Sequence, residues 1–179
     1  MTWQTRASRT VYENRWIRVE ENDVVGPHGA GIYGVVEMQH PAVFIVAVDE
    51  DDRVCLVSLE RYTTGASWEV PAGGSDGEDP LTAAQRELAE EAGITARRWT
   101  ALGRMDALNG IARAPEFVFL AQDIERGADA AASQREEGID AVRWVPFGDA
   151  LGMIRNGEIS DGETVAALAY AGIHLGRFA

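Results

Sequence analysis

The segment DPLTAAQRELAEEAG, residues 79–93, predicts a short amphipathic helix with both ends marked in the sequence. Asp79 is a good N-cap, Pro80 suits the first helical position, and Gly93 suits the left-handed residue that follows a helix. The apolar residues at helical spacing are Leu81, Ala84, Leu88 and Ala92. A stripe of this kind has to pack against a core, so the rest of the chain must supply an apolar surface for this helix.

Three glutamates crowd one side of the same helix, namely Glu87, Glu90 and Glu91. At about 100° per residue they fall within an arc of roughly 100°, and like charges four residues apart destabilise a helix. Arg86 can pair with Glu90 at that spacing, but one arginine does not neutralise three carboxylates. Hard oxygen ligands select Mg²⁺ or Mn²⁺ rather than zinc, so the cluster indicates a divalent metal site.

The loop before the helix, residues 72–77, reads AGGSDG. Because glycine tolerates unusual torsions, such a loop can bring backbone carbonyls close to the carboxylates. A carbonyl, two or three carboxylates and water would half-enclose a divalent cation, whose open positions favour the phosphates of a substrate. The competing interpretation is a solvated acidic face without metal.

Further periodic segments place this helix in a layered domain. Strands are predicted at 16–25, 32–39, 42–48, 53–62, 67–70, 99–105, 116–121 and 141–145, and two more helices at 148–155 and 163–174. Strands on either side of interspersed helices imply an α/β domain. A length of 179 residues suits one such domain with a substantial core.

Charge and composition exclude several classes of function. The net charge of −13, without any block of basic residues, argues against nucleic acid as a partner. No apolar run approaches the roughly 20 residues of a membrane span, and residues 1–10 are polar, so we expect neither membrane contact nor a signal peptide. The single cysteine, Cys55, lies in an apolar run and indicates a buried strand residue of a cytoplasmic protein.

Two sequence features exclude other kinds of active site. Lysine is absent, so the chain has neither a phosphate loop ending in GK[ST] nor a kinase-type lysine. Residues 73–77 match G-x-S-x-G, the nucleophile elbow of serine hydrolases, but that elbow puts the serine on a sharp turn into the helix. Here the predicted helix begins only near Pro80, so we set the esterase hypothesis aside.

The acidic helix carries a recognisable family motif. Glu78, seven residues and then RELAEEAGI (86–94) resemble the Nudix box, G-x5-E-x7-R-E-U-x-E-E-x-G-U with U aliphatic, in which Arg86 and Gly93 are fixed structural positions. This resemblance favours the metal site over a solvated acidic face. The family has five residues between its first glycine and the glutamate, whereas four separate Gly73 from Glu78. We therefore expect a loop one residue short, with altered carbonyl geometry.

Resemblance beyond the box points to the ADP-ribose pyrophosphatase branch of the family. WEVPAG (68–73) is similar to that branch's W-E-x-P-A-G, LERY (59–62) stands where it has a Q-Y-R-like strand end, and GEISD (157–161) resembles the start of its C-terminal helix. This resemblance implies a Nudix-type α/β/α sandwich with a central mixed sheet, preceded by N-terminal antiparallel strands. It also implies one domain over residues 1–179, with dimerising strands in 1–40 and a catalytic core in 41–179.

The resemblance also assigns roles by position. The expected metal ligands are the Ala72 carbonyl, Glu87, Glu90 and Glu91. Glu90 is alternatively the residue that orients a metal-bound water. The family places a further glutamate, as general base or extra ligand, on a loop before a late strand. Glu136 and Glu137 both occupy that place, and the sequence does not choose between them.

For substrate binding, the resemblance singles out Trp16 and Arg61. Trp16 lies where the branch offers an aromatic ring to the adenine, often across the interface of a homodimer, and Arg61 is expected to attract the phosphates. The implied reaction is hydrolysis of a nucleoside diphosphate linked to another group, with ADP-ribose giving AMP and ribose 5-phosphate. Other sugar nucleotides, dinucleoside polyphosphates and oxidised nucleotides stay open as substrates, and so does a non-catalytic nucleotide-binding module.

Overall fold

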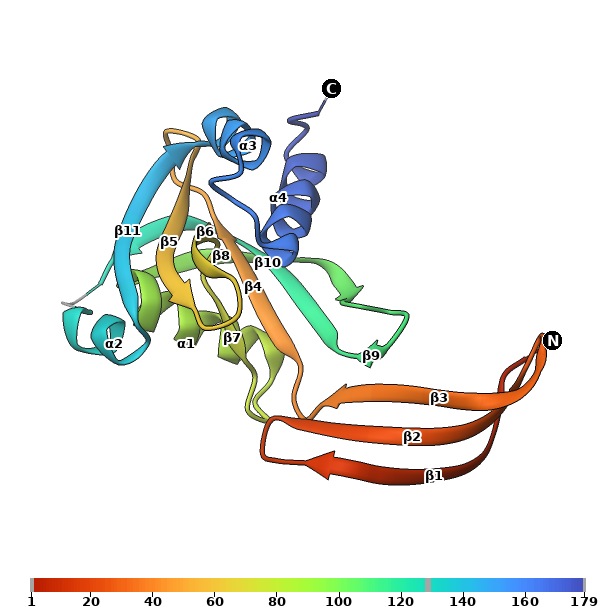
Figure 1. Ribbon diagram of the computed structural model, residues 1–179. Coiled ribbons are helices and arrows are strands. Elements are labelled where there is room, and N and C mark those ends of the chain that lie inside the picture. The colour runs from red at the N-terminus through yellow and green to blue at the C-terminus, as the bar shows by residue number, and fades with distance from the viewer. Residues whose placement is uncertain (1, 128–129, 179) are drawn as a thin grey trace.

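The computed structural model describes residues 2–127 and 130–178, and that part of the chain forms a mixed α/β fold (Figure 1). The strands are β1 Gln4–Glu13, β2 Ile17–Gly26, β3 Gly29–Met38, β4 Ala42–Ala47, β5 Arg53–Arg61, β6 Gly65–Glu69, β7 Ala72–Gly74, β8 Ile94–Asp106, β9 Ala112–Arg113, β10 Pro115–Arg126 and β11 Ile139–Pro146. The helices are α1 Pro80–Ala92, α2 Ala131–Glu136, α3 Phe147–Asn156 and α4 Gly162–His174.

Two sheets form the centre of the molecule. One has the order β7-β4-β10-β8 and is mixed, because β4 and β10 run parallel while the other pairs are antiparallel. The other is antiparallel with the order β11-β5-β6. Helices α1 and α2 lie on one side, and α3 and α4 lie on the other (Figure 1). This arrangement confirms the expected α/β/α fold, with a second sheet beside the mixed one.

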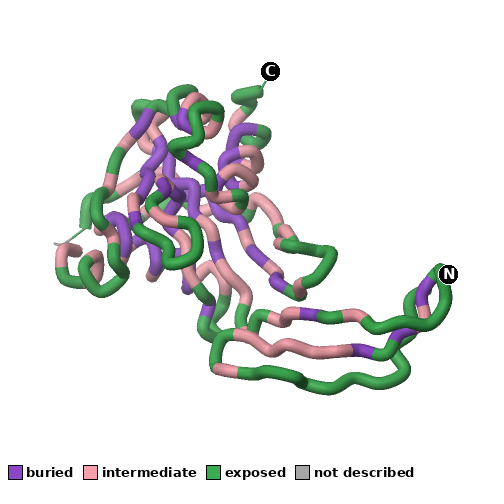
Figure 2. Tube along the Cα trace, viewed as in Figure 1, coloured by how far each residue is buried: buried purple, intermediate pink, exposed green. Residues whose placement is uncertain are grey.

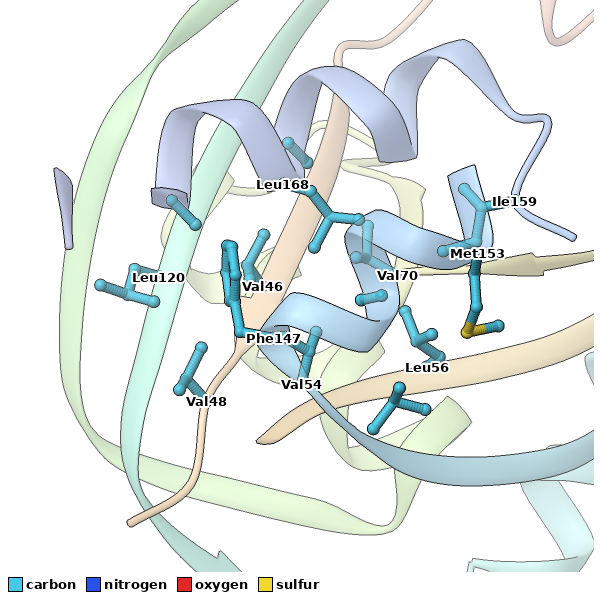
Figure 3. Packing of buried hydrophobic residues seen from close by; sticks show 14 of the residues in the cluster. Val46, Val48, Val54, Leu56, Val70, Leu120, Phe147, Met153, Ile159 and Leu168 are labelled. Atoms are coloured by element: carbon cyan, nitrogen blue, oxygen red, sulfur yellow. The ribbon is translucent and has the colours of Figure 1, made fainter. Parts of the chain in front are cut away.

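Strand β4 explains why helices cover both sides of the mixed sheet. Successive side chains of a strand point to opposite faces. Val46 therefore packs in one apolar cluster with Phe147 of α3 and Leu168 of α4, whereas Ile45 packs in the other cluster with Leu88 of α1. Figure 3 shows the first cluster gathered between the helices and the sheet, and Figure 2 shows that buried residues concentrate in these central layers.

Helix α1 has the bounds that its end signals predict. The Asp79 side chain accepts hydrogen bonds from the backbone N–H groups of Leu81 and Thr82, and Gly93 closes the helix with a left-handed φ of 66°. Its apolar stripe packs against β4 and β10, with Ala84 and Leu88 fully buried. Local signals were sufficient here because caps and periodicity are contained within the helix itself.

The N-terminal strands form a separate sheet with the order β1-β2-β3-β9, which extends away from the sandwich (Figure 1). Strands β2 and β3 pair around the predicted turn, with Gly26 opposite Gly29. Strand β1 was not predicted: all ten of its residues are exposed (Figure 2), so it lacks the alternation of apolar and polar residues that marks a strand. Only its pairing with β2 defines it.

Three other elements differ from the sequence-based expectation. Strands β8 and β10 are longer than predicted because they pair with each other over most of their length. The short strand β7 turns the first part of the glycine loop into a partner of β4, and α2 replaces an expected charged loop. No helix within residues 2–127 and 130–178 is long and apolar enough to cross a membrane.

Candidate active site

Two glutamates of α1 are buried against the glycine loop. The relative exposure of Glu87 is 6% and that of Glu91 is 5%, which is unusual for carboxylates. Glu91 Oε2 accepts a hydrogen bond of 2.9 Å from the backbone N–H of Ala72, at the start of β7. The acidic side of the helix is thus partly buried and is not a fully solvated surface.

Arg86 connects the acidic side of α1 to the loop. Its guanidinium donates to Glu78 at 3.0 Å, to Glu87 at 2.8 Å and to Glu90 at 3.0 Å. A fourth bond of 3.1 Å reaches the carbonyl oxygen of Gly74. The sequence predicted only the pair with Glu90, because the other contacts depend on how the loop folds over the helix.

Gly73 allows Glu87 to lie against the backbone of the loop. A Cβ atom at Gly73 would sit 2.2 Å from the Glu87 carboxyl carbon, which is far inside van der Waals contact. At the next position, Gly74, the nearest atom to such a Cβ is 3.5 Å away. The loop is one residue shorter than the family pattern, yet it places a glycine where the buried carboxylate needs the room.

The buried carboxylates are electrostatically under-compensated. The pKa of Glu91 is raised to about 8, mainly by burial and also by the charges of Glu87 and Glu137, against the opposing effects of the Ala72 hydrogen bond and Arg61. Burial also raises the pKa of Glu87, although Arg86 opposes that shift. Two arginines therefore leave these acids short of positive charge.

The donor set fits a hard divalent cation. Carboxylate oxygens in a desolvated, negatively charged position are what Mg²⁺ and Mn²⁺ bind, and they suit a softer metal poorly. Within the described residues no group of three or more His, Cys, Asp or Glu side chains is already gathered around one point. The carboxylate of Glu90 is paired with Arg86 instead, so the four metal ligands expected from the sequence stay a prediction.

Helix α2 docks on the end of α1. The Ser133 hydroxyl donates to the carbonyl oxygen of Glu90 and the Gln134 amide donates to that of Glu91, both at 3.0 Å. These bonds satisfy carbonyls that a helix C-terminus otherwise leaves without partners. They also fix the position of Glu137, which directly follows α2.

The two candidate bases, Glu136 and Glu137, both stay predictions. The charge of Glu137 is among the causes that raise the pKa of Glu87 and of Glu91. We therefore take Glu137 as the first candidate. The sequence analysis did not identify Ser133 and Gln134 as contacts of α1. No local pattern shows that a polar segment about 40 residues downstream docks on that helix.

The expected substrate-binding residues lie in different places. Arg61 donates to Glu69 at 2.7 Å and borders a cavity of about 390 Å³. Its charge lowers the pKa of Glu91, so it acts on the acidic site. Trp16 is 58% exposed on the turn between β1 and β2, where the Arg15 guanidinium lies 4.0 Å from the ring centroid. Trp16 does not border the cavity that contains Arg61.

Comparisons with known proteins agree with this geometry. Residues 38–168 match the NUDIX domain model, and residues 3–36 match a model described as the nucleoside diphosphate sugar hydrolase N-terminal domain. The chain is 31% identical to an ADP-ribose pyrophosphatase of Mycobacterium tuberculosis, over 96% of this chain and 81% of that protein. It is 29% identical to CMP-5'-(N-acetyl-N-hydroxy-3-aminopropyl)phosphonate hydrolase of Streptomyces rubellomurinus, over 97% of this chain and 84% of that protein.

A solved structure shares the fold. The crystal structure of an ADP compounds hydrolase superposes with a TM-score of 0.84 at 22% sequence identity, covering 98% of this chain and 95% of that one. At this level of identity the likeness concerns the arrangement of the strands and helices. It includes the N-terminal strands, because almost the whole chain is covered.

Glu91→Gln should change how stability depends on pH. The pKa of Glu91 is about 8 in the folded protein and about 4.5 when unfolded, so the folded state binds more protons between these values. In chelator-treated protein the free energy of unfolding should therefore fall as the pH rises from about 5 to 8. Glu91→Gln should weaken this fall by roughly 1–4 kcal/mol, measured by urea denaturation at each pH. A slope equal to that of the parent protein would contradict the assignment, and exposed Glu50→Gln is the control.

Gly73→Ala should displace Glu87, whereas Gly74→Ala should not. The new methyl group would lie 2.2 Å from the Glu87 carboxyl carbon in the first variant, whereas in the second its nearest neighbour is 3.5 Å away. Crystal structures of both variants should show the Arg86–Glu87 hydrogen bond lost in Gly73→Ala and kept in Gly74→Ala. An unmoved carboxylate in Gly73→Ala would show that the loop gives way instead.

Proposed function

Because the chain belongs to the Nudix family, we propose that it is a metal-dependent hydrolase of the pyrophosphate bond in a nucleoside diphosphate linked to another group. The leading substrate is ADP-ribose, with AMP and ribose 5-phosphate as products. The observation that supports this proposal most is the pair of buried glutamates held against the glycine loop, with every acidic position of the family motif occupied. The similarity to ADP-ribose pyrophosphatases over most of the chain supports the choice of substrate.

In the proposed mechanism Glu87, Glu91 and the Ala72 carbonyl would hold the divalent cation, Mg²⁺ or Mn²⁺. When bound, the metal would draw charge from the diphosphate and activate water for attack. Arg86 holds Glu90 at the exposed edge of the site, where its carboxylate orients the attacking water or adds a ligand. Arg61 offers a guanidinium to the diphosphate and shares it with buried Glu69.

Glu137 is the proposed general base. It follows the helix that is pinned on the end of α1, and its charge acts on Glu87 and Glu91. A carboxylate in this position can accept a proton from the water as that water attacks phosphorus in line with the leaving oxygen. The single thiol of the chain, on Cys55, is buried among apolar residues, and burial raises its pKa to about 12, so it is not a candidate nucleophile. We therefore expect direct hydrolysis without a covalent intermediate.

We further propose a homodimer formed through the N-terminal strands. Strand β1 is an edge strand with every residue exposed, and an uncovered edge of this length is a ready surface for a second chain. In that dimer Trp16 would present its exposed ring to the adenine bound by the partner subunit. Sedimentation equilibrium tests the dimer, and a monomer at micromolar concentration would contradict it.

The experiment that tests the function is a substrate panel. The purified protein should release AMP from ADP-ribose with Mg²⁺ or Mn²⁺ and lose this activity in excess EDTA, measured by chromatography of the products. Other sugar nucleotides, dinucleoside polyphosphates, oxidised nucleotides and a CMP-linked phosphonate complete the panel, the last because of the Streptomyces relative. Turnover of none of them would refute the hydrolase proposal, and preference for another member would replace ADP-ribose.

Glu137→Gln and Glu136→Gln form a matched pair for the base. The two residues are neighbours, and the charge of Glu137 acts on the buried glutamates, so Glu137→Gln should lower kcat by about 10²–10⁴-fold. Glu136→Gln should stay within about threefold of the parent, because in this proposal Glu136 takes no part in the proton transfer. Equal rates in all three proteins would show that the base lies elsewhere.

A further inference from the structure

Helix α2 directly precedes the proposed base, Glu137, but it has no hydrophobic anchor. It spans Ala131–Glu136, and none of these residues is buried. A helix of this length is unstable by itself in water, because one or two turns do not repay the cost of nucleation. Polar contacts with the rest of the fold must therefore hold α2, and with it Glu137, in place.

The contacts with α1 are made by Ser133 and Gln134. The Ser133 hydroxyl donates to the carbonyl oxygen of Glu90, and the Gln134 amide donates to the carbonyl oxygen of Glu91, both at 3.0 Å. The Ser133 hydroxyl also lies 3.0 Å from the carbonyl oxygen of Ala130, so its single proton serves two acceptors. Gln134 therefore makes the stronger of the two bonds to α1.

The two acceptors belong to the residues whose side chains form the acidic site. Glu90 and Glu91 lie in the last turn of α1, where carbonyl groups have no partner within the helix and carry its partial negative charge. The donors of Ser133 and Gln134 reduce that negative charge beside the clustered carboxylates. They also fix the position of α2 relative to the backbone of Glu90 and Glu91.

Glu137 is held between these contacts and the sheet. Its N–H donates to the carbonyl oxygen of Ser133 at 2.9 Å, which joins it to the docked turn. The next residue, Gly138, has a left-handed φ of 71°, which glycine adopts without strain. The chain then enters β11, where Ile139 pairs with Leu59 of β5. With its sheet end fixed, the position of Glu137 depends on whether α2 stays docked on α1.

We propose that Gln134 and Ser133 are positioning residues of the reaction. By bonding to the last carbonyls of α1 they hold Glu137 where it can accept a proton from the attacking water. This inference rests on the proposed function, because it takes Glu137 as the base. Neither Gln134 nor Ser133 is assigned a contact with the substrate. Loss of their bonds should therefore slow the chemical step and leave binding of the nucleotide almost unchanged.

Steady-state kinetics with ADP-ribose and Mg²⁺ test this role. Gln134→Met keeps the length of the side chain without its donor, and Ser133→Ala removes the hydroxyl. Two lost hydrogen bonds imply that the double variant lowers kcat by about 10–100-fold, with KM within about twofold of the parent. Gln134→Met alone should cost more than Ser133→Ala alone. An unchanged kcat, or a loss that appears only in KM, would overturn the proposal.

Two further variants separate loss of the bonds from general damage to α2. Ser133→Thr keeps a hydroxyl at this position and should retain most of the kcat that Ser133→Ala loses. Arg135→Ala changes the exposed neighbour of Gln134 and should stay within about twofold of the parent. If Ser133→Thr and Arg135→Ala are as slow as the double variant, α2 is merely sensitive to substitution and the proposal is wrong.

The dependence on Glu137 gives a sharper test. If Gln134 and Ser133 act through the base, their bonds have nothing to position once the base is gone. The double variant should then cause almost no further loss of kcat in a Glu137→Gln background, because effects of groups that act as a unit are not additive. The same fold-loss in both backgrounds would show that the two residues act on something other than Glu137.

Proteolysis measures the docking of α2 without relying on turnover. Trypsin cleaves after arginine, and Arg135 lies on α2, so cleavage there should follow the fraction of molecules in which α2 is undocked. Mass spectrometry of nucleotide-free protein should show cleavage after Arg135 about tenfold faster in the double variant. Cleavage after exposed Arg6 of β1 is the internal control and should not change. Equal rates at Arg135 would show that these bonds do not hold α2.

The two readouts distinguish this inference from the proposed function. Hydrolysis of ADP-ribose by the parent with an equal kcat in the double variant would refute the positioning role and keep the hydrolase. A parent protein that hydrolyses no member of the substrate panel would refute the hydrolase and, with it, the catalytic role of these bonds. Faster cleavage after Arg135 in the double variant would still establish that they hold α2.

Discussion

The contact between Arg86 and the acidic side of α1 is the interaction on which the site depends. Glu87 and Glu91 are removed from water, which is costly for charged groups unless they are paired and hydrogen-bonded. One guanidinium supplies bonds to three glutamates and to a loop carbonyl, and thereby joins the helix to the loop that covers it. The compensation is incomplete, as the raised pKa of Glu91 shows, and the proposed divalent cation would complete it.

The sandwich fold holds the elements around this contact in fixed positions relative to β4. Strand β4 holds the glycine loop on one edge and β10 on the other, while its two faces carry α1 and α4. At the start of α4 the buried Thr164 hydroxyl accepts a hydrogen bond from the Val70 N–H, which fixes that helix beside the glycine loop. The glycine loop, α1 and α4 are thus all held against the same strand.

The protein is acidic and so is its proposed substrate, which means that positive charge is needed near the candidate site. The net charge of −13 repels nucleotides at long range, so attraction has to arise close to the site. Arg61 borders the cavity of about 390 Å³ and pairs with buried Glu69 there, and its charge also acts on Glu91.

The sequence alone determined the elements whose signals are local. The caps and apolar stripe gave helix α1 its bounds, the alternation of residues gave most of the strands, and the spacing of the motif identified the family. The fold class and the burial of Cys55 followed from the same patterns. These predictions succeeded because a helix cap or a buried strand depends on residues within a few positions of each other.

Only the tertiary structure decided the features that depend on residues distant in the sequence. Strand β1 has no apolar alternation and exists through its pairing with β2, and α2 is placed by Ser133 and Gln134 on the end of α1. The proposal of Glu137 as the base rests on its charge acting on Glu87 and Glu91, an effect that no local pattern of two adjacent glutamates reveals. Long-range contacts set the surroundings of a charge, and those surroundings determine what the charge can bind.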